Sequence, residues 1–174
     1  MKTDRLALRT AHKDDASQLE QFYLENRDHF MRFESLPRNA VAQLHQWYFE
    51  ECEGTARRFL IVNPEDVIMG MCHFTQIFRG PFQACYLGYK LAEKFQGQGI
   101  MFEALSLAIP FMFEKENLHR IMANYMPSNE RSARLLQKLG FIIEGQAKSY
   151  LFINGKWEDH VLSSLTNTDW RPPE

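Results

Sequence analysis

The sequence predicts one domain of the mixed α/β (α+β) class, with its elements in the order βααβββαβαββ. Three observations support this prediction. Short β-rich runs alternate with stretches of helical apolar spacing, two segments carry hairpin signals, and a glycine-rich turn joins a buried run to an apolar helix. The 174 residues, of which 45% are apolar and 24% charged, suffice for one sizeable core. We therefore expect residues 1–174 to form a single domain.

The first third of the chain predicts one strand and two helices. Leu6 and Leu8 alternate with arginines, as in a short half-buried strand. Residues 14–30 begin with two aspartates and then repeat apolar side chains at mostly helical spacing. A second helix is expected over residues 41–51, where Gly54 provides the stop signal.

The middle of the chain predicts a hairpin, a central strand and a buried helix. Residues 59–62 and 67–75 are β-rich and flank a turn that contains Asn63 and Pro64. Residues 84–91 are apolar on both faces, which is typical of a central buried strand. A glycine turn then leads into the helix of residues 100–113, where Pro110 predicts a kink.

The last third predicts a strand, a well-marked helix and a final hairpin. Residues 119–125 form the strand, and the helix runs from Asn129 as N-cap to Gly140 at its C-terminal end. Residues 141–153 and 157–165 flank an Asn-Gly pair, the strongest short hairpin signal.

Charge and cysteine content exclude several classes of function. The chain has 20 basic and 22 acidic residues, so no overall positive field attracts nucleic acid or anionic membranes. Cys52, Cys72 and Cys85 are not spaced as zinc or redox pairs, and we expect no metal site. The longest apolar stretch is too interrupted to cross a bilayer. These features favour a cytoplasmic protein without a membrane partner.

The glycine turn at residues 96–99 is a candidate anion site. Unpaired backbone N–H groups and the positive end of a helix dipole meet at such a turn. A nucleotide-binding P-loop needs Lys and then Ser or Thr where Ile100 and Met101 stand. The dinucleotide fingerprint needs a small residue in place of Phe102. Both nucleotide motifs are therefore excluded.

A family resemblance fits what remains. Residues 96–101 resemble the acetyl-CoA loop of the GNAT acetyltransferases, and residues 129–141 resemble their second cofactor motif. Over its whole length the chain resembles the ribosomal-protein branch of that family. The resemblance implies the GNAT acyl-CoA acyltransferase fold, a mixed, mostly antiparallel splayed sheet with helices on both faces. It also implies acetyl-CoA as co-substrate, no metal, and acetylation of the N-terminal alanine of a small-subunit ribosomal protein.

The resemblance assigns the cofactor contacts to three segments. The backbone of the central strand would hold the pantetheine arm, the glycine turn the diphosphate, and the second motif the pantetheine again. These residues are Tyr89, Lys90, Leu91, Gln96, Gly97, Gln98, Gly99, Ile100, Met101, Asn129 and Ser132. Met101 departs from the usual small residue, but its side chain can turn into the core while its N–H binds. Asn129 also suits a purely structural N-cap.

The catalytic residues are less sharply defined by the sequence. Many relatives carry a Tyr seven residues after the motif Asn, but Leu136 stands there. Ser132 resembles the serine of the ribosomal-protein branch and is our candidate acid for the leaving thiolate, with Tyr125 as second choice. The candidate bases are His73, Tyr86 and Glu103.

Two other functions stay open at this stage. The acceptor could be a small amine, such as a polyamine or an antibiotic, because spacing and composition do not distinguish amines. Aromatic and cationic residues also interleave at 30–33 and 57–59, as in RNA-binding surfaces. A non-catalytic module that contacts RNA or the ribosome would use those patches, but it would leave both cofactor motifs unused. The oligomeric state is not predicted.

Overall fold

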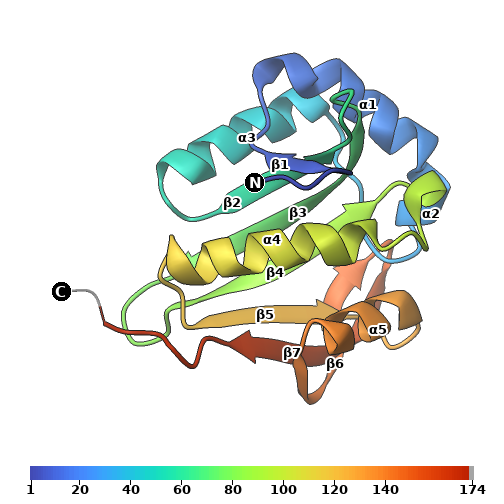
Figure 1. Cartoon of the computed structure of the whole chain (residues 1–174). Helices are drawn as coiled ribbons and strands as arrows, with labels where there is room; N and C mark the ends of the chain where they lie inside the picture. The colour runs from blue at the N-terminus through green and yellow to red at the C-terminus, as the bar shows by residue number, and fades with distance from the viewer. Residues whose placement is uncertain (173–174) are drawn as a thin grey trace.

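The computed structural model describes residues 1–172 and contains a seven-stranded sheet in the order β1-β2-β3-β4-β5-β7-β6 (Figure 1). Neighbouring strands are antiparallel except for β4 and β5, which are parallel. The strands are β1 (Ala7–Arg9), β2 (Arg57–Val62), β3 (Ile68–Phe78), β4 (Ala84–Leu91), β5 (Arg120–Tyr125), β6 (Ile142–Ile153) and β7 (Lys156–Thr166).

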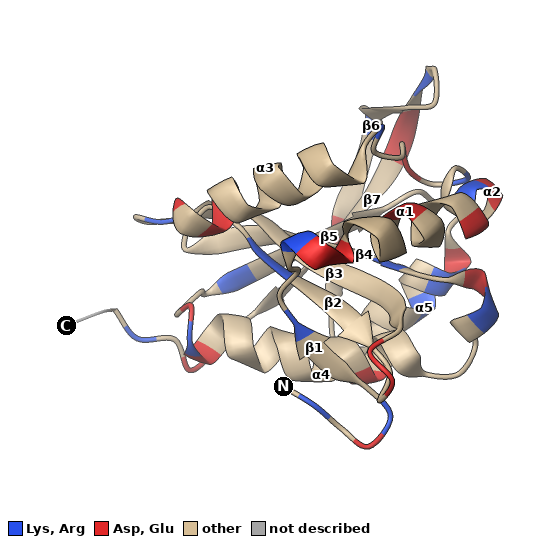
Figure 2. Ribbon diagram, turned by 90° about the horizontal axis from the view of Figure 1, so that it is seen from above, with Lys and Arg blue, Asp and Glu red and all other residues tan. Residues whose placement is uncertain are grey.

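The helices cover both faces of this sheet. They are α1 (Ala16–Glu25), α2 (Arg27–Phe30), α3 (Ala40–Cys52), α4 (Ile100–Glu114) and α5 (Glu130–Lys138), with 3-10 turns η1 (Lys13–Asp15) and η2 (Glu93–Phe95). One buried cluster packs α1, α2 and α3 on the sheet, and another packs α4 and α5 on the opposite face (Figure 2). The predicted fold class is confirmed, and the predicted element order holds except that the first expected helix is divided into α1 and α2.

The first predicted helix is the main departure from that order, because it is interrupted at Asn26. The side chain of Asn26 is buried, donates to the carbonyl of Phe22 at 2.8 Å and accepts the N–H of Glu93 at 2.8 Å. The chain therefore leaves α1 at Glu25 and restarts as α2. This break fixes α2 beside the segment that follows β4.

The sequence predicts that β4 is buried on both faces. In the structure, this holds only for part of the strand. It pairs with β5 only at Ala84, Cys85 and Tyr86, and beyond this point the two strands part. Gly88 is exposed and Tyr89 is half-buried, although the first half of the strand is buried. The apolar composition of β4 thus hides an opening in the sheet.

Local end signals are reproduced. The N–H of Phe141 donates to the carbonyl of Leu136 at 2.9 Å, and Gly140 has φ +90°, which places a left-handed glycine after α5. Asn154 and Gly155 have φ +49° and +87°, as a tight hairpin turn requires.

Helix α4 continues past Pro110, which lies on its exposed side. Ser106, whose carbonyl would otherwise accept a bond from position 110, is also exposed, so water can replace that bond. Among the described residues, no helix has the length and apolar character needed to span a membrane.

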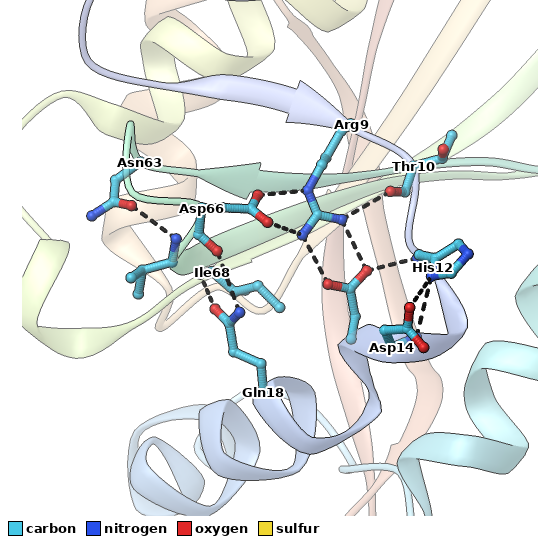
Figure 3. A network of polar contacts seen from close by, with 10 residues as sticks. Arg9, Thr10, His12, Asp14, Gln18, Asn63, Asp66 and Ile68 are labelled. Carbon is cyan, nitrogen blue, oxygen red and sulfur yellow. Dashed lines mark hydrogen bonds and ion pairs between the residues drawn. The ribbon is translucent and has the colours of Figure 1, made fainter.

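A polar network ties the N-terminal strand to its surroundings (Figure 3). The guanidinium of Arg9 donates to both carboxylate oxygens of Asp15, at 2.9 and 2.8 Å, and to Asp66 at 2.8 Å. Asp15 also accepts the N–H of His12 at 2.6 Å. The network joins β1, η1 and the turn between β2 and β3.

Candidate active site

A cavity of about 400 Å³ opens where β4 parts from β5. We call it the loop cavity. Its walls are formed by the end of β4, the turn before α4 and the beginning of α5. The remaining wall is formed by α2 and by the segment that follows it, up to Glu34. It is lined by ten of the residues that the sequence assigns to cofactor binding: Tyr89, Lys90, Leu91, Gln96, Gly97, Gly99, Ile100, Met101, Asn129 and Ser132. Chain segments far apart in the sequence thus converge on one opening.

Free backbone N–H groups gather at the start of α4. Within the described part of the chain, no acceptor takes the N–H groups of residues 97–102, whereas the N–H of Glu103 donates to the carbonyl of Gly99 at 3.0 Å. Gly97 and Gly99 have φ of +73° and +76°, a conformation that glycine adopts without strain. The side chains of Ile100 and Met101 turn into the core, as expected for Met101. The turn can therefore bind an anion through its backbone.

The side chain of Gln96 holds this turn in place. Its amide donates to the carbonyl of Leu91 at 2.9 Å and lies 3.1 Å from His29 Nε2. Burial lowers the pKa of His29, so a neutral ring can accept this bond. Gln96 thus links the turn to β4 and α2, and its side chain is already occupied.

Gln98 and Glu103 do not line the loop cavity, and they do not line a smaller cavity that adjoins it. Arg5 donates to the carbonyl of Gln98 at 3.0 Å and pairs with Glu103, which also accepts the hydroxyl of Thr3. The hydrogen bonds from Thr3 and Arg5 lower the pKa of Glu103. This geometry does not support Glu103 as a base, because its carboxylate is occupied outside the opening.

The charge around the loop cavity is mostly positive. Its lining includes the cations Lys90, Arg131 and Arg134, whereas Glu34 is the single carboxylate among the described lining residues. Although the chain has a net charge of −2, cationic side chains gather at this opening. The distribution suits a ligand that carries several phosphates.

A smaller cavity of about 220 Å³ adjoins the first. We call it the strand cavity. Its lining includes His73 on β3, Gly88 on β4, Asn124 and Tyr125 on β5, and His160 on β7. Six residues line both cavities: Phe33, Glu34, Tyr89, Lys90, Asn129 and Ser132. The two spaces therefore meet at a shared wall.

Asn129 and Ser132 stand on that wall at the start of α5. The side-chain oxygen of Asn129 accepts the N–H of Ser132 at 3.2 Å, so the N-cap predicted from the sequence is present. The amide nitrogen of Asn129 has no protein acceptor among the described residues and remains available to a ligand. The structural role of Asn129 and a binding role are compatible.

The phenol of Tyr89 is the most unusual polar group of the wall. Its hydroxyl is buried and makes no hydrogen bond of normal geometry within residues 1–172, although the side chain of Ser132 lies close to it. Burial raises the pKa of Tyr89 to about 12, with Ser132 close enough to oppose that rise. Sequence reasoning selected Tyr89 only for its backbone and missed the side chain. This hydroxyl can therefore bind a ligand atom at the shared wall.

The remaining acid and base candidates are separated by the structure. Tyr125 is buried and lines the strand cavity. His73 lines it too, with Nδ1 buried and unpartnered, and burial holds the pKa of His73 well below its ordinary value. Tyr86 lines neither cavity and lies beside Tyr150. His73 is thus neutral and lies where a substrate can reach it. Tyr86 lies outside both cavities.

Glu34 is a site residue that sequence reasoning missed. It follows α2, in a stretch without a motif, and its carboxylate pairs with the ammonium of Lys90 on β4. Burial raises the pKa of Glu34, and Lys90 opposes that rise. Lys90, selected for its backbone, contributes this side chain as well. Only the fold brings these two residues together.

No group of metal-binding side chains occurs in the part of the chain that the structure describes. The opening combines free backbone N–H groups, cations, hydroxyls, imidazoles and, among the described lining residues, one carboxylate. These groups suit the transfer of an acyl group from a large anionic thioester to an amine.

Comparison with known proteins agrees with this assignment. The family model for the acetyltransferase (GNAT) domain matches residues 5–142. The chain is 46% identical over 181 residues to the [ribosomal protein uS5]-alanine N-acetyltransferase of Escherichia coli, covering 99% of this chain and 93% of that protein. The chain therefore belongs to the GNAT acetyltransferases and is an acetyl-CoA-dependent N-acetyltransferase by class.

Two solved structures resemble the chain along most of its length. The ribosomal-protein-S5-alanine acetyltransferase from Vibrio fischeri has a TM-score of 0.93 and 37% identity, covering 99% of this chain and 98% of that chain. Mycobacterium smegmatis RimJ in complex with CoA-disulfide has a TM-score of 0.86 and 26% identity, covering 92% and 81%. The resemblance of the sequence to RimJ, the bacterial ribosomal-protein-alanine N-acetyltransferase, is confirmed.

Proposed function

We propose that this chain transfers the acetyl group of acetyl-CoA to the α-amine of the N-terminal alanine of ribosomal protein uS5. The observation that carries this proposal is the similarity to the E. coli uS5-alanine enzyme over nearly the full length of both chains. The site has what such a reaction needs: an anion-binding turn, a gap in the sheet, and a second cavity for an amine. We treat the whole chain as one catalytic domain.

The loop cavity fits acetyl-CoA. Its diphosphate would lie on the free N–H groups before α4, with Arg131 and Arg134 beside its other phosphate. The pantetheine arm would run between β4 and β5, where residues 89–91 have no strand partner on the β5 side and the amide of Asn129 is available. The thioester would then reach the wall that both cavities share.

The chemistry requires help at two points. Attack of the neutral amine places negative charge on the thioester oxygen, which a backbone N–H of β4 can stabilise where the strands part. The leaving thiolate then needs a proton. Ser132 is our first candidate donor, and the buried, unpartnered hydroxyl of Tyr89 stands on the same wall. Tyr125, which lines the strand cavity, is the alternative proton donor that the sequence suggests.

Two alternatives are less well supported. A module that only binds RNA or the ribosome would leave the free N–H groups and both cavities unused, and the family assignment places the chain among enzymes. A small amine as acceptor is not favoured by the full-length similarity to the uS5-alanine enzyme. A ribosomal substrate is consistent with the expected cytoplasmic location, which we retain as part of the proposal.

The proposal is tested by following the release of coenzyme A thiol in the presence of defined acceptors. A synthetic N-terminal peptide of uS5 that begins with alanine should be acetylated, and the same peptide with a blocked α-amine should not. Spermidine serves as the small-amine acceptor. Preference for spermidine over the peptide would replace the ribosomal substrate with a small amine, and no turnover with either would refute the enzyme assignment.

A further inference from the structure

Glu34 provides the only carboxylate that lines either cavity among the residues described by the structure. It stands on the shared wall, beside Lys90, Asn129 and Ser132. An N-terminal amine carries a positive charge at neutral pH, since an α-amine has a pKa of about 8. The otherwise cationic opening therefore presents a single anionic group where such an amine has to arrive.

The side chain of Glu34 is held in place but not fully used. Its Oε2 pairs with the ammonium of Lys90, while Oε1 accepts no hydrogen bond from residues 1–172. Lys90 is in turn fixed, with Nζ 5.3 Å from the ring centre of Tyr23 and 5.6 Å from that of Phe30. The carboxylate thus keeps one free oxygen at a defined position.

The main chain at Glu34 is held by a residue near the C-terminal end of the sequence. The side-chain amide of Asn154, at the β6–β7 turn, donates to the carbonyls of Met31 and Glu34, at 2.6 and 3.1 Å. The N–H of Glu34 donates to the carbonyl of Phe30 at 3.2 Å. These contacts position a residue that lies outside any regular helix or strand.

We infer that Glu34 is the acceptor-binding residue of this enzyme: its free oxygen binds the α-ammonium group of the incoming N-terminus and takes one proton from it. This inference rests on the proposed function, because it concerns the amine substrate of the same site. The site would thereby select an N-terminus that carries a free, cationic amine.

The protons and bonds balance as follows. The ammonium gives one proton to Glu34, which passes it to solvent. The neutral amine then forms the C–N bond to the acetyl carbon, and the C–S bond of the thioester breaks. The second proton lost by the nitrogen goes to the departing thiolate. One acetyl amide, one thiol and one solvent proton result.

Other ionisable groups around Glu34 leave this role to it. Lys90 on β4 and Tyr23 on α1 pack against its side chain, and His29 on α2 and Arg131 on α5 share the loop cavity. His73 on β3, Tyr89 on β4, Tyr125 on β5 and His160 on β7 share the strand cavity. None of these side chains is a carboxylate, so among them only Glu34 can form an ion pair with an ammonium group.

The test compares wild-type enzyme with the Glu34→Gln, Glu34→Asp and Glu20→Gln variants, using the uS5 peptide. Glu20 is exposed on α1 and lies outside both cavities, so it is the matched control. Glu34→Gln should lower kcat/KM for the peptide about 100-fold at pH 7. Glu34→Asp should restore part of that loss, and Glu20→Gln should match the wild type. The KM for acetyl-CoA should stay unchanged in all variants.

A pH series separates this role from a merely structural one. At pH 9 most α-amine is already neutral, so the deficit of Glu34→Gln should shrink to about 10-fold or less. A deficit that is equal at both pH values, or that is matched by a weaker affinity for acetyl-CoA, would overturn the inference. A Glu34→Gln variant as active as wild type would do the same.

Failure of the proposed function has a different signature. A wild-type enzyme that acetylates spermidine but not the peptide refutes the uS5 substrate, and the Glu34→Gln comparison is then made with spermidine. The inference holds if the pH-dependent deficit follows the amine that is accepted. A wild-type enzyme that acetylates neither amine overturns the proposed function and the inference together.

Discussion

The guanidinium of Arg5, at the start of the chain, donates to the main-chain carbonyl of Gln98 at 3.0 Å. It thereby fixes the peptide that precedes Gly99, while its pair with Glu103 fixes the first turn of α4. The N-terminal segment thus acts as a brace for the anion-binding turn. This relationship explains Glu103 without a role in proton transfer.

The brace predicts a binding defect rather than a chemical one. Arg5→Met should raise the KM for acetyl-CoA roughly 3- to 10-fold, because one hydrogen bond of about 1 kcal/mol is lost. Glu103→Gln should leave kcat within about 3-fold of wild type, whereas loss of a general base costs about 100-fold or more. Lys13→Met, which removes an exposed cation elsewhere, is the control. Steady-state kinetics with varied acetyl-CoA distinguish the two outcomes, and a large fall in kcat for Glu103→Gln would restore its catalytic assignment.

Ser132 should affect turnover and not cofactor affinity. Ser132→Ala removes the hydroxyl from the wall shared by both cavities, and we expect kcat to fall about 100-fold if that hydroxyl donates the proton to the thiolate. The dissociation constant of coenzyme A, measured by calorimetry, should change little. Ser128→Ala, an exposed serine just before α5, is the control. An unaltered rate in Ser132→Ala would transfer the role of acid to another hydroxyl, with Tyr89→Phe as the next variant.

Substitution of Gly99 should weaken the binding of acetyl-CoA. Gly99→Val places a branched side chain on a residue with φ +76°, at the N-terminus of α4 that would hold the diphosphate. We expect acetyl-CoA to bind at least about 10-fold more weakly, the equivalent of about 1.4 kcal/mol. Gly80→Val has a similar φ of +66° and open space around it, but lies outside both cavities. Equal effects of the two variants on cofactor affinity would show that backbone strain alone is responsible.

The Arg9–Asp15 pair should govern acid stability. Hydrogen bonds from Arg9 lower the pKa of Asp15, although burial opposes them. The ionised carboxylate therefore stabilises the fold above its unfolded pKa of about 4, and this contribution is lost as the pH falls through the lower folded value. Asp15→Asn should reduce the free energy of unfolding by about 2 kcal/mol at pH 7.

Urea unfolding at pH 7 and at pH 3 measures this effect. The difference between wild type and Asp15→Asn should narrow at pH 3, because the Asp15 carboxyl of the unfolded wild type then takes up a proton and the folded state loses part of its advantage. Asp14→Asn, whose side chain is exposed, should shift stability by less than about 0.5 kcal/mol at either pH. A difference that stays constant with pH would assign the loss to packing rather than to the charge of Asp15.

Features that depend on local chemistry could be predicted from the sequence. Asn129 caps α5, Gly140 follows its end, and the Asn154-Gly155 turn closes the last hairpin, because each signal acts within a few residues of itself. The free N–H groups before α4 follow from the glycine turn and the start of a helix in the same way.

Features that depend on distant partners could not. Asn26 ends α1 by bonding Glu93, 67 residues further along the chain, and Glu34 pairs with Lys90, 56 residues further along. The opening of β4 arises because β5 leaves it after three paired residues, which an apolar strand sequence does not reveal. The sequence offers Glu103 as a base that could reach a central slot, but Arg5 and Thr3 hold its carboxylate, and Glu103 lines neither cavity.

The most direct test of the central claim is to locate the acetyl group on intact uS5. The purified ribosomal protein is incubated with this enzyme and acetyl-CoA, and tandem mass spectrometry identifies the modified residue. The account predicts one added acetyl group, on the α-amine of the N-terminal alanine. Acetylation on lysine side chains, or no acetylation while a small amine is modified, would contradict it.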